Sequence, residues 1–90
     1  MESLLLIREF EREFYELVEI IRFERGRRYV YKAFTGDRTY YIHVVVIGDV
    51  VYVELWHPNF AVPLLVFRIS GQEELASVLV MLKSLVGKFY

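Results

Sequence analysis

The chain has 90 residues, enough for one small domain, which buries a smaller share of its surface than a large domain does. It lacks cysteine, which excludes disulfide bonds and cysteine-based metal sites, and its net charge of −1 gives no overall attraction to nucleic acid. With 56% hydrophobic and 17% aromatic residues, a monomer would leave much apolar surface in water, so we expect a homo-oligomer.

The choice of polar residues is also informative. Asn59 and Gln72 are the only amide side chains, and most charges come from Glu, Arg and Lys. Few thermolabile residues and many charges are typical of hyperthermophile proteins. The first residues lack the basic start and long apolar core of a secretory signal, and no stretch approaches the roughly 20 apolar residues of a membrane span. We therefore expect a cytoplasmic protein.

Apolar residues recur at helical spacing near the start of the chain. Successive positions of this stripe are three or four residues apart, which predicts an amphipathic helix over 3–24. Gly26 is expected to end the helix, because glycine adopts a left-handed cap conformation at no steric cost. The stripe consists of Ile7, Phe10, Phe14, Leu17 and Ile21.

Four segments rich in β-branched and aromatic residues follow. Gly36-Asp37 and Gly48-Asp49 separate the first three segments, and glycine at the first central position suits a two-residue type II′ turn. A longer loop over 57–62 leads to the last segment. The pattern predicts a four-stranded antiparallel meander. Its strands are 27–34, 38–47, 49–56 and 63–69.

The last predicted element is a helix over about 71–88. Ser70 and Glu73 form a capping-box pattern at its start. The helix is apolar nearly all round, and such helices are normally buried on more than one side. We expect the side that carries Val80 and Met81 to contact another subunit. The elements together predict one α+β domain over 1–90, in which the meander is flanked by an N-terminal and a C-terminal helix.

The two short turns also fix which residues face one another. A turn at 36–37 places Lys32 opposite Tyr41, and a turn at 48–49 places Tyr41 opposite Trp56. Because side chains alternate between faces, one face is apolar and is predicted to be the core. It comprises Tyr29, Tyr31, Ala33, Tyr40, Ile42, Val44, Val46, Val51, Val53, Leu55, Leu65, Phe67 and Ile69. The other, here named the basic-aromatic face, comprises Arg28, Lys32, Tyr41, His43, Tyr52, Glu54, Trp56 and Arg68.

Positive charge is concentrated around this second face. Residues 25–43 carry five basic and one acidic residue, whereas residues 1–24 carry three basic and seven acidic ones. Aromatic rings stack on unpaired bases at about 1–3 kcal/mol per base, and Arg and Lys neutralise phosphates. We therefore predict binding of single-stranded nucleic acid, with DNA as the expected ligand. The predicted site comprises Arg25, Arg27, Arg28, Lys32, Arg38, Tyr41, His43, Tyr52, Trp56 and Arg68.

A family resemblance points the same way. The segment RGRRYVYK (25–32), the hyperthermophile composition and the order helix, four-stranded antiparallel sheet, helix resemble the archaeal ThermoDBP-related proteins. The resemblance covers nearly the whole chain. It implies a single-stranded-DNA-binding protein assembled from several subunits.

Three other hypotheses compete with this one. If the basic-aromatic face is buried between subunits, the protein is a structural or protein-interaction homo-oligomer that binds no nucleic acid. His43 opposite Glu54 is a candidate acid–base pair, but no nucleophile accompanies it, so we expect no enzyme. His57 with these two residues lacks the spacing of a metal site, and we expect neither a metal nor another cofactor.

Overall fold

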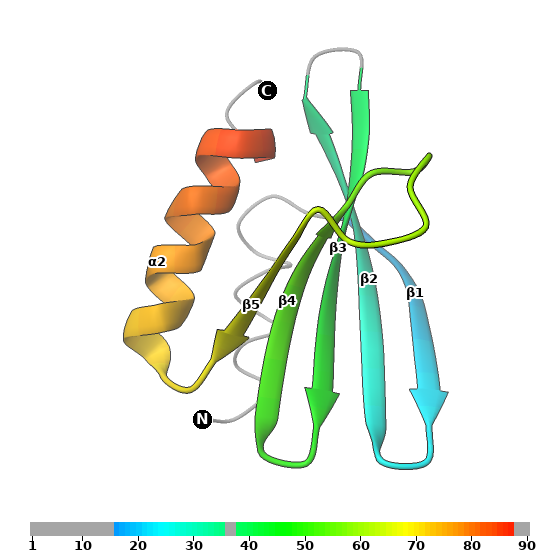
Figure 1. Ribbon diagram of the computed structural model, residues 1–90, viewed down its shortest axis with the longest axis vertical. Helices are drawn as coiled ribbons and strands as arrows, with labels where there is room; N and C mark the ends of the chain where they lie inside the picture. Colours follow the sequence, from blue (N-terminus) through cyan, green and yellow to red (C-terminus); the bar gives the residue numbers. More distant parts are fainter. Residues whose placement is uncertain (1–15, 36–37, 88–90) are drawn as a thin grey trace.

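The computed structural model describes residues 16–35 and 38–87, which form an α+β fold (Figure 1). Five antiparallel strands lie in the order β1-β2-β3-β4-β5, so the sheet is a meander. A C-terminal helix follows the last strand and packs on one face of the sheet. The elements are β1 (Glu16–Phe23), β2 (Gly26–Thr35), β3 (Arg38–Ile47), β4 (Val50–Trp56), β5 (Leu65–Ile69), α2 (Gln72–Leu82) and the π-helical turn η1 (Lys83–Gly87). Of the described helices, none has the length and apolar character needed to cross a membrane.

The predicted register of the two central hairpins is confirmed. Lys32 lies opposite Tyr41, and Tyr41 lies opposite Trp56. Gly48 has a φ of 57°, and Asp49 after it does not have a positive φ. This is the pattern of a type II′ turn, as predicted. The turn at 36–37 lies outside the described residues, but the strands on either side of it have the predicted pairing.

The predicted N-terminal helix is wrong over 16–23, which form β1, and its remainder at 3–15 lies outside the described residues. Val18, Ile20 and Ile21 are β-branched and favour an extended backbone. A tight turn at 24–25 lets this segment pair with β2. The spacing of the apolar residues in this segment fits both the helical period and the strand period. Pairing with β2 decides in favour of the strand. The sheet therefore has five strands in the described chain, not the predicted four.

Gly26 is a strand residue and not the predicted helix cap. It pairs with Phe23 on one side and Ile47 on the other. A Cβ at this position would lie 1.9 Å from the carbonyl oxygen of Val46. The glycine is therefore needed because β2 and β3 approach closely, and its φ is not in the left-handed region.

The predicted apolar face is the core. Tyr31, Ile42, Val44 and Val53 are fully buried. Leu65 departs from the prediction, since it lies on the edge strand β5 and is 38% exposed. The buried cluster comprises Tyr31, Ala33, Ile42, Val44, Val51, Val53, Leu55 and Ile69 of the sheet with Leu75, Val78 and Leu82 of α2.

The start of α2 differs from the predicted capping box. The N-cap is Gly71, without a side-chain cap hydrogen bond, and the residue that reaches back is Glu74, not Glu73. The Glu74 carboxylate accepts hydrogen bonds from the Ser70 hydroxyl at 2.6 Å and the Ser70 backbone N–H at 2.9 Å. These bonds hold the pKa of Glu74 below its ordinary value. The helix begins one residue later than predicted, which moves Glu74 into the third helical position.

We expect Gly26→Ala to destabilise the fold by roughly 1–3 kcal/mol, because the added methyl group forces β2 and β3 apart. Urea unfolding measures this change. Gly71→Ser is the control, because a Cβ at Gly71 meets no atom within 4 Å and serine suits an N-cap. Equal stability of the Gly26→Ala variant and the wild type would contradict the close approach of the strands.

Candidate functional site

The basic-aromatic face lies on the side of the sheet opposite the core, as predicted. Three rows of side chains cross it. One row includes Lys32, Tyr41 and Trp56; the second is Glu19, Val30, His43, Glu54 and Val66; the third is Ile21, Arg28, Val45, Tyr52 and Arg68. Within these rows, Val30 and Val45 are buried and form an apolar floor that the sequence analysis did not single out.

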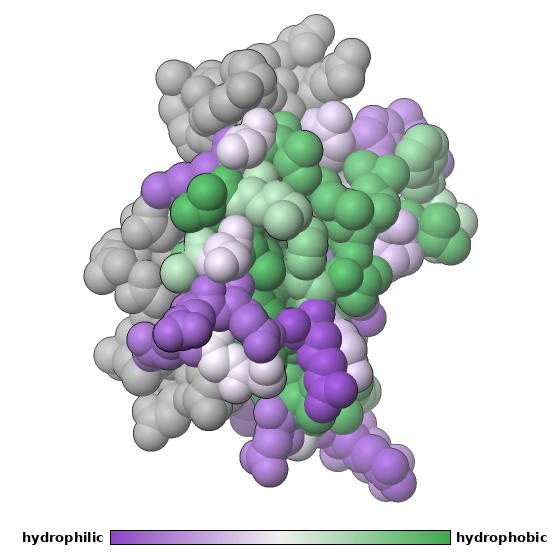
Figure 2. Space-filling view, turned by 60° about the vertical axis from the view of Figure 1, so that its left-hand side comes forward, coloured by the Kyte–Doolittle hydropathy of each residue, from purple (hydrophilic) through white to green (hydrophobic). Residues whose placement is uncertain are grey.

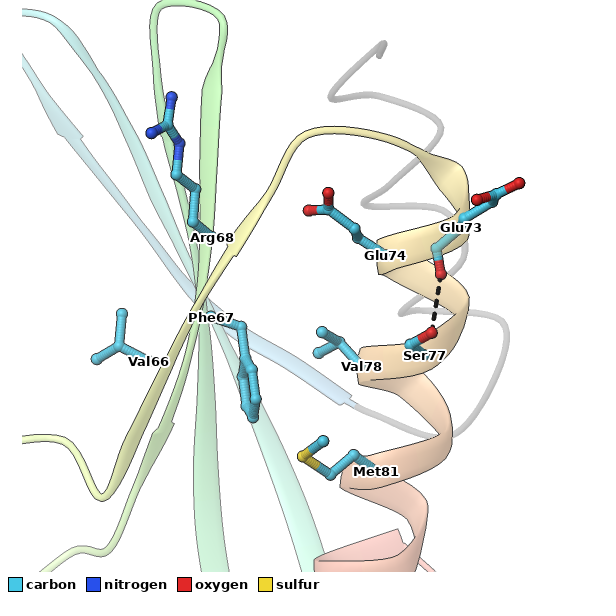
Figure 3. Close-up of a pocket in the computed structure, with 8 residues that line it drawn as sticks. All are labelled: Val66, Phe67, Arg68, Glu73, Glu74, Ser77, Val78 and Met81. Atoms are coloured by element: carbon cyan, nitrogen blue, oxygen red, sulfur yellow. Dashed lines mark hydrogen bonds between the residues drawn. The ribbon is translucent and has the colours of Figure 1, made fainter.

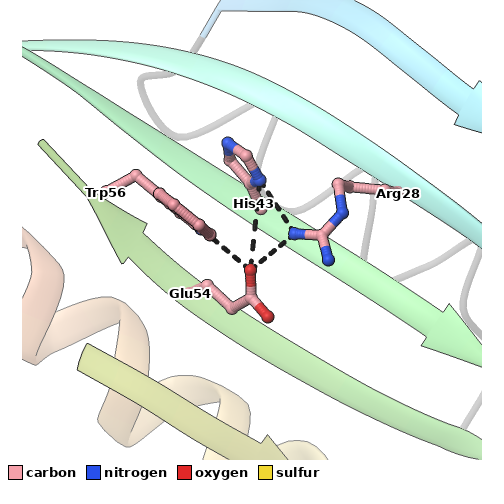
Figure 4. A network of polar contacts seen from close by, with 4 residues as sticks. All are labelled: Arg28, His43, Glu54 and Trp56. Carbon is pink, nitrogen blue, oxygen red and sulfur yellow. Dashed lines mark hydrogen bonds and ion pairs between the residues drawn. The ribbon is translucent and has the colours of Figure 1, made fainter. Parts of the chain in front are cut away.

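Glu54 is the centre of a polar network on this face (Figure 4). One of its carboxylate oxygens, Oε1, accepts hydrogen bonds from Arg28 Nη1 at 2.5 Å and from Trp56 Nε1 at 2.8 Å. The side chain of Glu54 is 15% exposed and that of Arg28 is 28% exposed. This pairing neutralises the Arg28 charge, so the face is less positive than the sequence analysis predicted.

His43 belongs to the same network and is neutral at physiological pH. Arg28 Nη1 lies 2.9 Å from His43 Nδ1. Arginine only donates, so Nδ1 is the acceptor and the ring proton is on Nε2. Burial and the neighbouring Arg28 lower the pKa of His43 to about 4, although Glu54 acts in the opposite direction.

The arrangement does not provide a direct contact for acid–base exchange between His43 and Glu54. His43 Nδ1 lies 4.0 Å from Glu54 Oε1, and both atoms contact the same Arg28 nitrogen. A neutral imidazole that accepts at Nδ1 has no proton there to give to the carboxylate. The Arg28 guanidinium therefore bridges the two groups, whereas an acid–base pair would share a proton directly.

The network holds two flat rings together. The imidazole of His43 stacks on the indole of Trp56, with centroids 5.1 Å apart and planes inclined by 21°. The indole N–H is fixed by Glu54, and the imidazole is fixed by Arg28. Both rings are partly exposed. The result is a preoriented aromatic pair, flanked by Tyr41 across the strand.

Three predicted site residues do not join this arrangement. Arg25 lies in the turn at 24–25, and Arg27 lies on the other face, opposite Arg22 and Val46. The guanidinium of Arg27 donates to the hydroxyl of Tyr29 at 3.5 Å. Arg38 is the first residue of β3, and its side chain lies outside the described part of the structure.

His57 belongs to a separate group in the loop after β4. Its ring meets Tyr40 edge-on at 5.6 Å and Phe60 at 5.0 Å, and its Nδ1 accepts the Asn59 backbone N–H at 3.1 Å. It is therefore not brought together with His43. Over residues 16–35 and 38–87, no group of three His, Asp or Glu side chains is placed to hold a metal ion.

Comparison of the chain with protein-family models, curated proteins and solved structures gave no match. The resemblance to the ThermoDBP-related proteins therefore stays a prediction. The layout on which it is based holds in part, because the described chain has five strands and the predicted N-terminal helix fails over 16–23.

The unusual state of His43 is directly measurable. We expect its ring to titrate near pH 4 in an NMR titration of the folded protein, against 6.5 for an unperturbed histidine. Between these values the unfolded chain binds a proton that the folded chain does not. The free energy of unfolding therefore falls as the pH falls through this window.

The Arg28→Met variant separates the effect of Arg28 on the pKa of His43 from the effect of burial. It removes the positive charge and the hydrogen bond to the unprotonated Nδ1, so the pKa of His43 should rise. A wild-type midpoint near 6.5 would contradict the network drawn in Figure 4.

Proposed function

We propose that the protein binds single-stranded nucleic acid, DNA in the first place, on its basic-aromatic face. The observation that carries the proposal is the stacked pair of His43 and Trp56, which Arg28 and Glu54 hold in place on an otherwise partly exposed sheet face. Rings that are oriented before binding lose little freedom when a base stacks on them.

The shape of the face favours single strands over duplexes. Trp56 and Tyr41 are direct cross-strand neighbours, so their side chains start about 5 Å apart. Unpaired bases expose the faces that such rings contact, whereas base pairs in a duplex are stacked on both sides. No described helix presents a basic surface suited to a DNA groove, since α2 has acidic residues in its first turn and none that are basic in its last.

Phosphate contacts contribute the smaller part of the proposed affinity. Arg28 is paired with Glu54, so in the proposal the phosphate contact is made by Arg68 on the edge strand β5. One phosphate contact on a single strand gives a salt dependence of about −0.7 in log K against log salt concentration. We therefore expect binding that is dominated by stacking and only moderately sensitive to salt.

The composition and the family resemblance extend the proposal to a cytoplasmic, homo-oligomeric protein of a hyperthermophilic archaeon. A second candidate function is a homo-oligomeric interaction module without nucleic-acid binding. The observation that favours it is the exposure of Val80 and Met81 on α2, at 65% and 44%. These residues form the side of the helix that we expect to contact another subunit.

Fluorescence anisotropy with labelled single-stranded and duplex oligonucleotides tests the proposal. We expect saturable binding of the single strand at low salt and much weaker binding of the duplex. The absence of binding to either oligonucleotide at low salt would refute the proposed function and leave the interaction module as the better account.

Ring removal tests the site itself. We expect Trp56→Ala and Tyr41→Ala each to weaken single-strand binding roughly 5- to 150-fold, which corresponds to the loss of one stacked base. Phe60→Ala is the matched control, because Phe60 is an exposed aromatic residue in the loop and not on the face. Circular dichroism must show that each variant stays folded. If Phe60→Ala weakens binding as much as Trp56→Ala does, the site is wrongly placed.

Arg68→Gln tests the electrostatic part. The variant removes one cation at the β5 border of the face, so the slope of log K against log salt should become shallower by about 0.7. An unchanged slope would show that Arg68 contacts no phosphate.

A further inference from the structure

The outer side of β5 forms a groove with α2 (Figure 3). Val66, Phe67, Val78 and Met81 line its apolar part, and its volume is about 550 Å³. Charged side chains, among them Arg68, stand at the end where α2 begins. The groove therefore combines a hydrophobic floor with a charged border, which is the composition of many protein–protein contacts.

The surface around the groove is unusually apolar. Val66 is 53% exposed, and Leu64, Leu65, Val80 and Met81 are also exposed. Figure 2 shows hydrophobic side chains gathered over the middle of this side of the molecule, with polar residues mainly below them. Continuous apolar patches of this kind mark contact surfaces in water-exposed proteins.

Among the described residues, the backbone of β5 is paired on one side only. β5 is the last strand of the sheet, so no described strand lies against its outer edge. The N–H and C=O groups along such an edge are a template for another strand. A partner that adds a strand here would satisfy the backbone and cover the apolar side chains at the same time.

We propose that this partner is a second copy of the chain, and that β5 pairs antiparallel with β5 of the partner subunit about a two-fold axis at Phe67. The axis is perpendicular to the sheet, so both subunits turn the same face to the same side. The two α2 helices then meet over the junction and cover the groove.

The strand sequence favours this register. Centring the pair on Phe67 places Leu65 opposite Ile69 of the partner subunit and Val66 opposite Arg68 of the partner subunit. Each apolar residue of β5 then lies opposite an apolar residue or the aliphatic part of an arginine side chain of the partner subunit. Moving the axis to Arg68 would place two arginines directly opposite each other, which is destabilising.

The charges on α2 are complementary in the same arrangement. Glu73 and Glu74 lie in its first turn, and Lys83 follows its last residue. Antiparallel packing of the two helices brings the acidic start of each toward the end where Lys83 follows the other helix. Such complementarity selects the antiparallel orientation over the parallel one.

The opposite edge of the sheet is a poorer candidate. β1 also exposes Ile20 and Ile21, but it carries the charges of Glu19 and Arg22 and a β-bulge between Leu17 and Glu19. Charges and bulges are the features that protect edge strands from pairing. β5 has a single charge, and it pairs with β4 without a register shift.

The dimer itself does not depend on nucleic-acid binding. One consequence rests on the proposed function: the two basic-aromatic faces become one surface across ten strands, about 48 Å wide at 4.8 Å per strand. A single strand that crosses the junction would then contact both subunits.

Sedimentation equilibrium without nucleic acid tests the dimer. We expect a mass of twice the 10.8 kDa of one chain. Val66→Lys should weaken dimerisation roughly tenfold or more, because the new charge faces Arg68 of the partner subunit. Val66→Glu should dimerise better than Val66→Lys, since its carboxylate faces the same arginine. If the substitutions acted on folding alone, Val66→Lys would be tolerated better than Val66→Glu, because Val66 lies opposite Glu54 of its own chain. An effect on folding would therefore not reproduce the expected result.

Ile20→Lys is the matched control, because Ile20 is 42% exposed on the other edge of the sheet. It should leave the dimer intact, as should Trp56→Ala, which affects nucleic-acid binding only. A monomeric wild-type protein, or a dimer that Ile20→Lys disrupts and Val66→Lys does not, would overturn the proposal. Failure of nucleic-acid binding with an intact dimer would instead refute the proposed function alone.

Discussion

The cross-strand pairs of β2, β3 and β4 depend on the short hairpin turns that join these strands. At Gly48 a positive φ lets β3 reverse into β4 within two residues, and the register that follows runs from Ile47 and Val50 to Tyr41 and Trp56. A slip by one residue would move every side chain to the other face. Because the core needs its valines and isoleucines inside, the turns and the core enforce the same register. The composition of the basic-aromatic face is a consequence of that agreement.

On that face, Glu54 determines how the charged groups are paired and how the rings are oriented. Its Oε1 atom accepts from Arg28 and from Trp56, so one carboxylate cancels a positive charge and orients the indole. The same Arg28 nitrogen approaches His43, whose pKa is lowered to about 4. The imidazole is therefore a neutral ring that stacks on Trp56. The network converts a nominally basic surface into a mainly aromatic one, which suits bases better than phosphates.

The sequence was sufficient for the parts that local rules determine. Hairpin spacing predicted the pairing of β2, β3 and β4, and alternation then predicted the two faces. It failed for β1, because Val18, Ile20 and Ile21 in a short amphipathic segment fit a helix and a strand equally well, and only the pairing with β2 decides. Alternation also placed Arg28 and Glu54 on one face without revealing their ion pair, because long side chains reach partners two strands away. Arg27 was assigned to the site from its charge alone, and it lies on the opposite face.

The central claim is that Trp56 is presented to bases by a face that stays accessible. Trp56 is the only tryptophan in the chain, so its emission reports on this face alone. The most direct measurement is a titration of intrinsic fluorescence with unlabelled single-stranded DNA and with the matching duplex. The account predicts saturable quenching by the single strand and little change with the duplex. Blue-shifted emission that neither nucleic acid alters would contradict it, and would indicate that the face is buried in a contact between subunits.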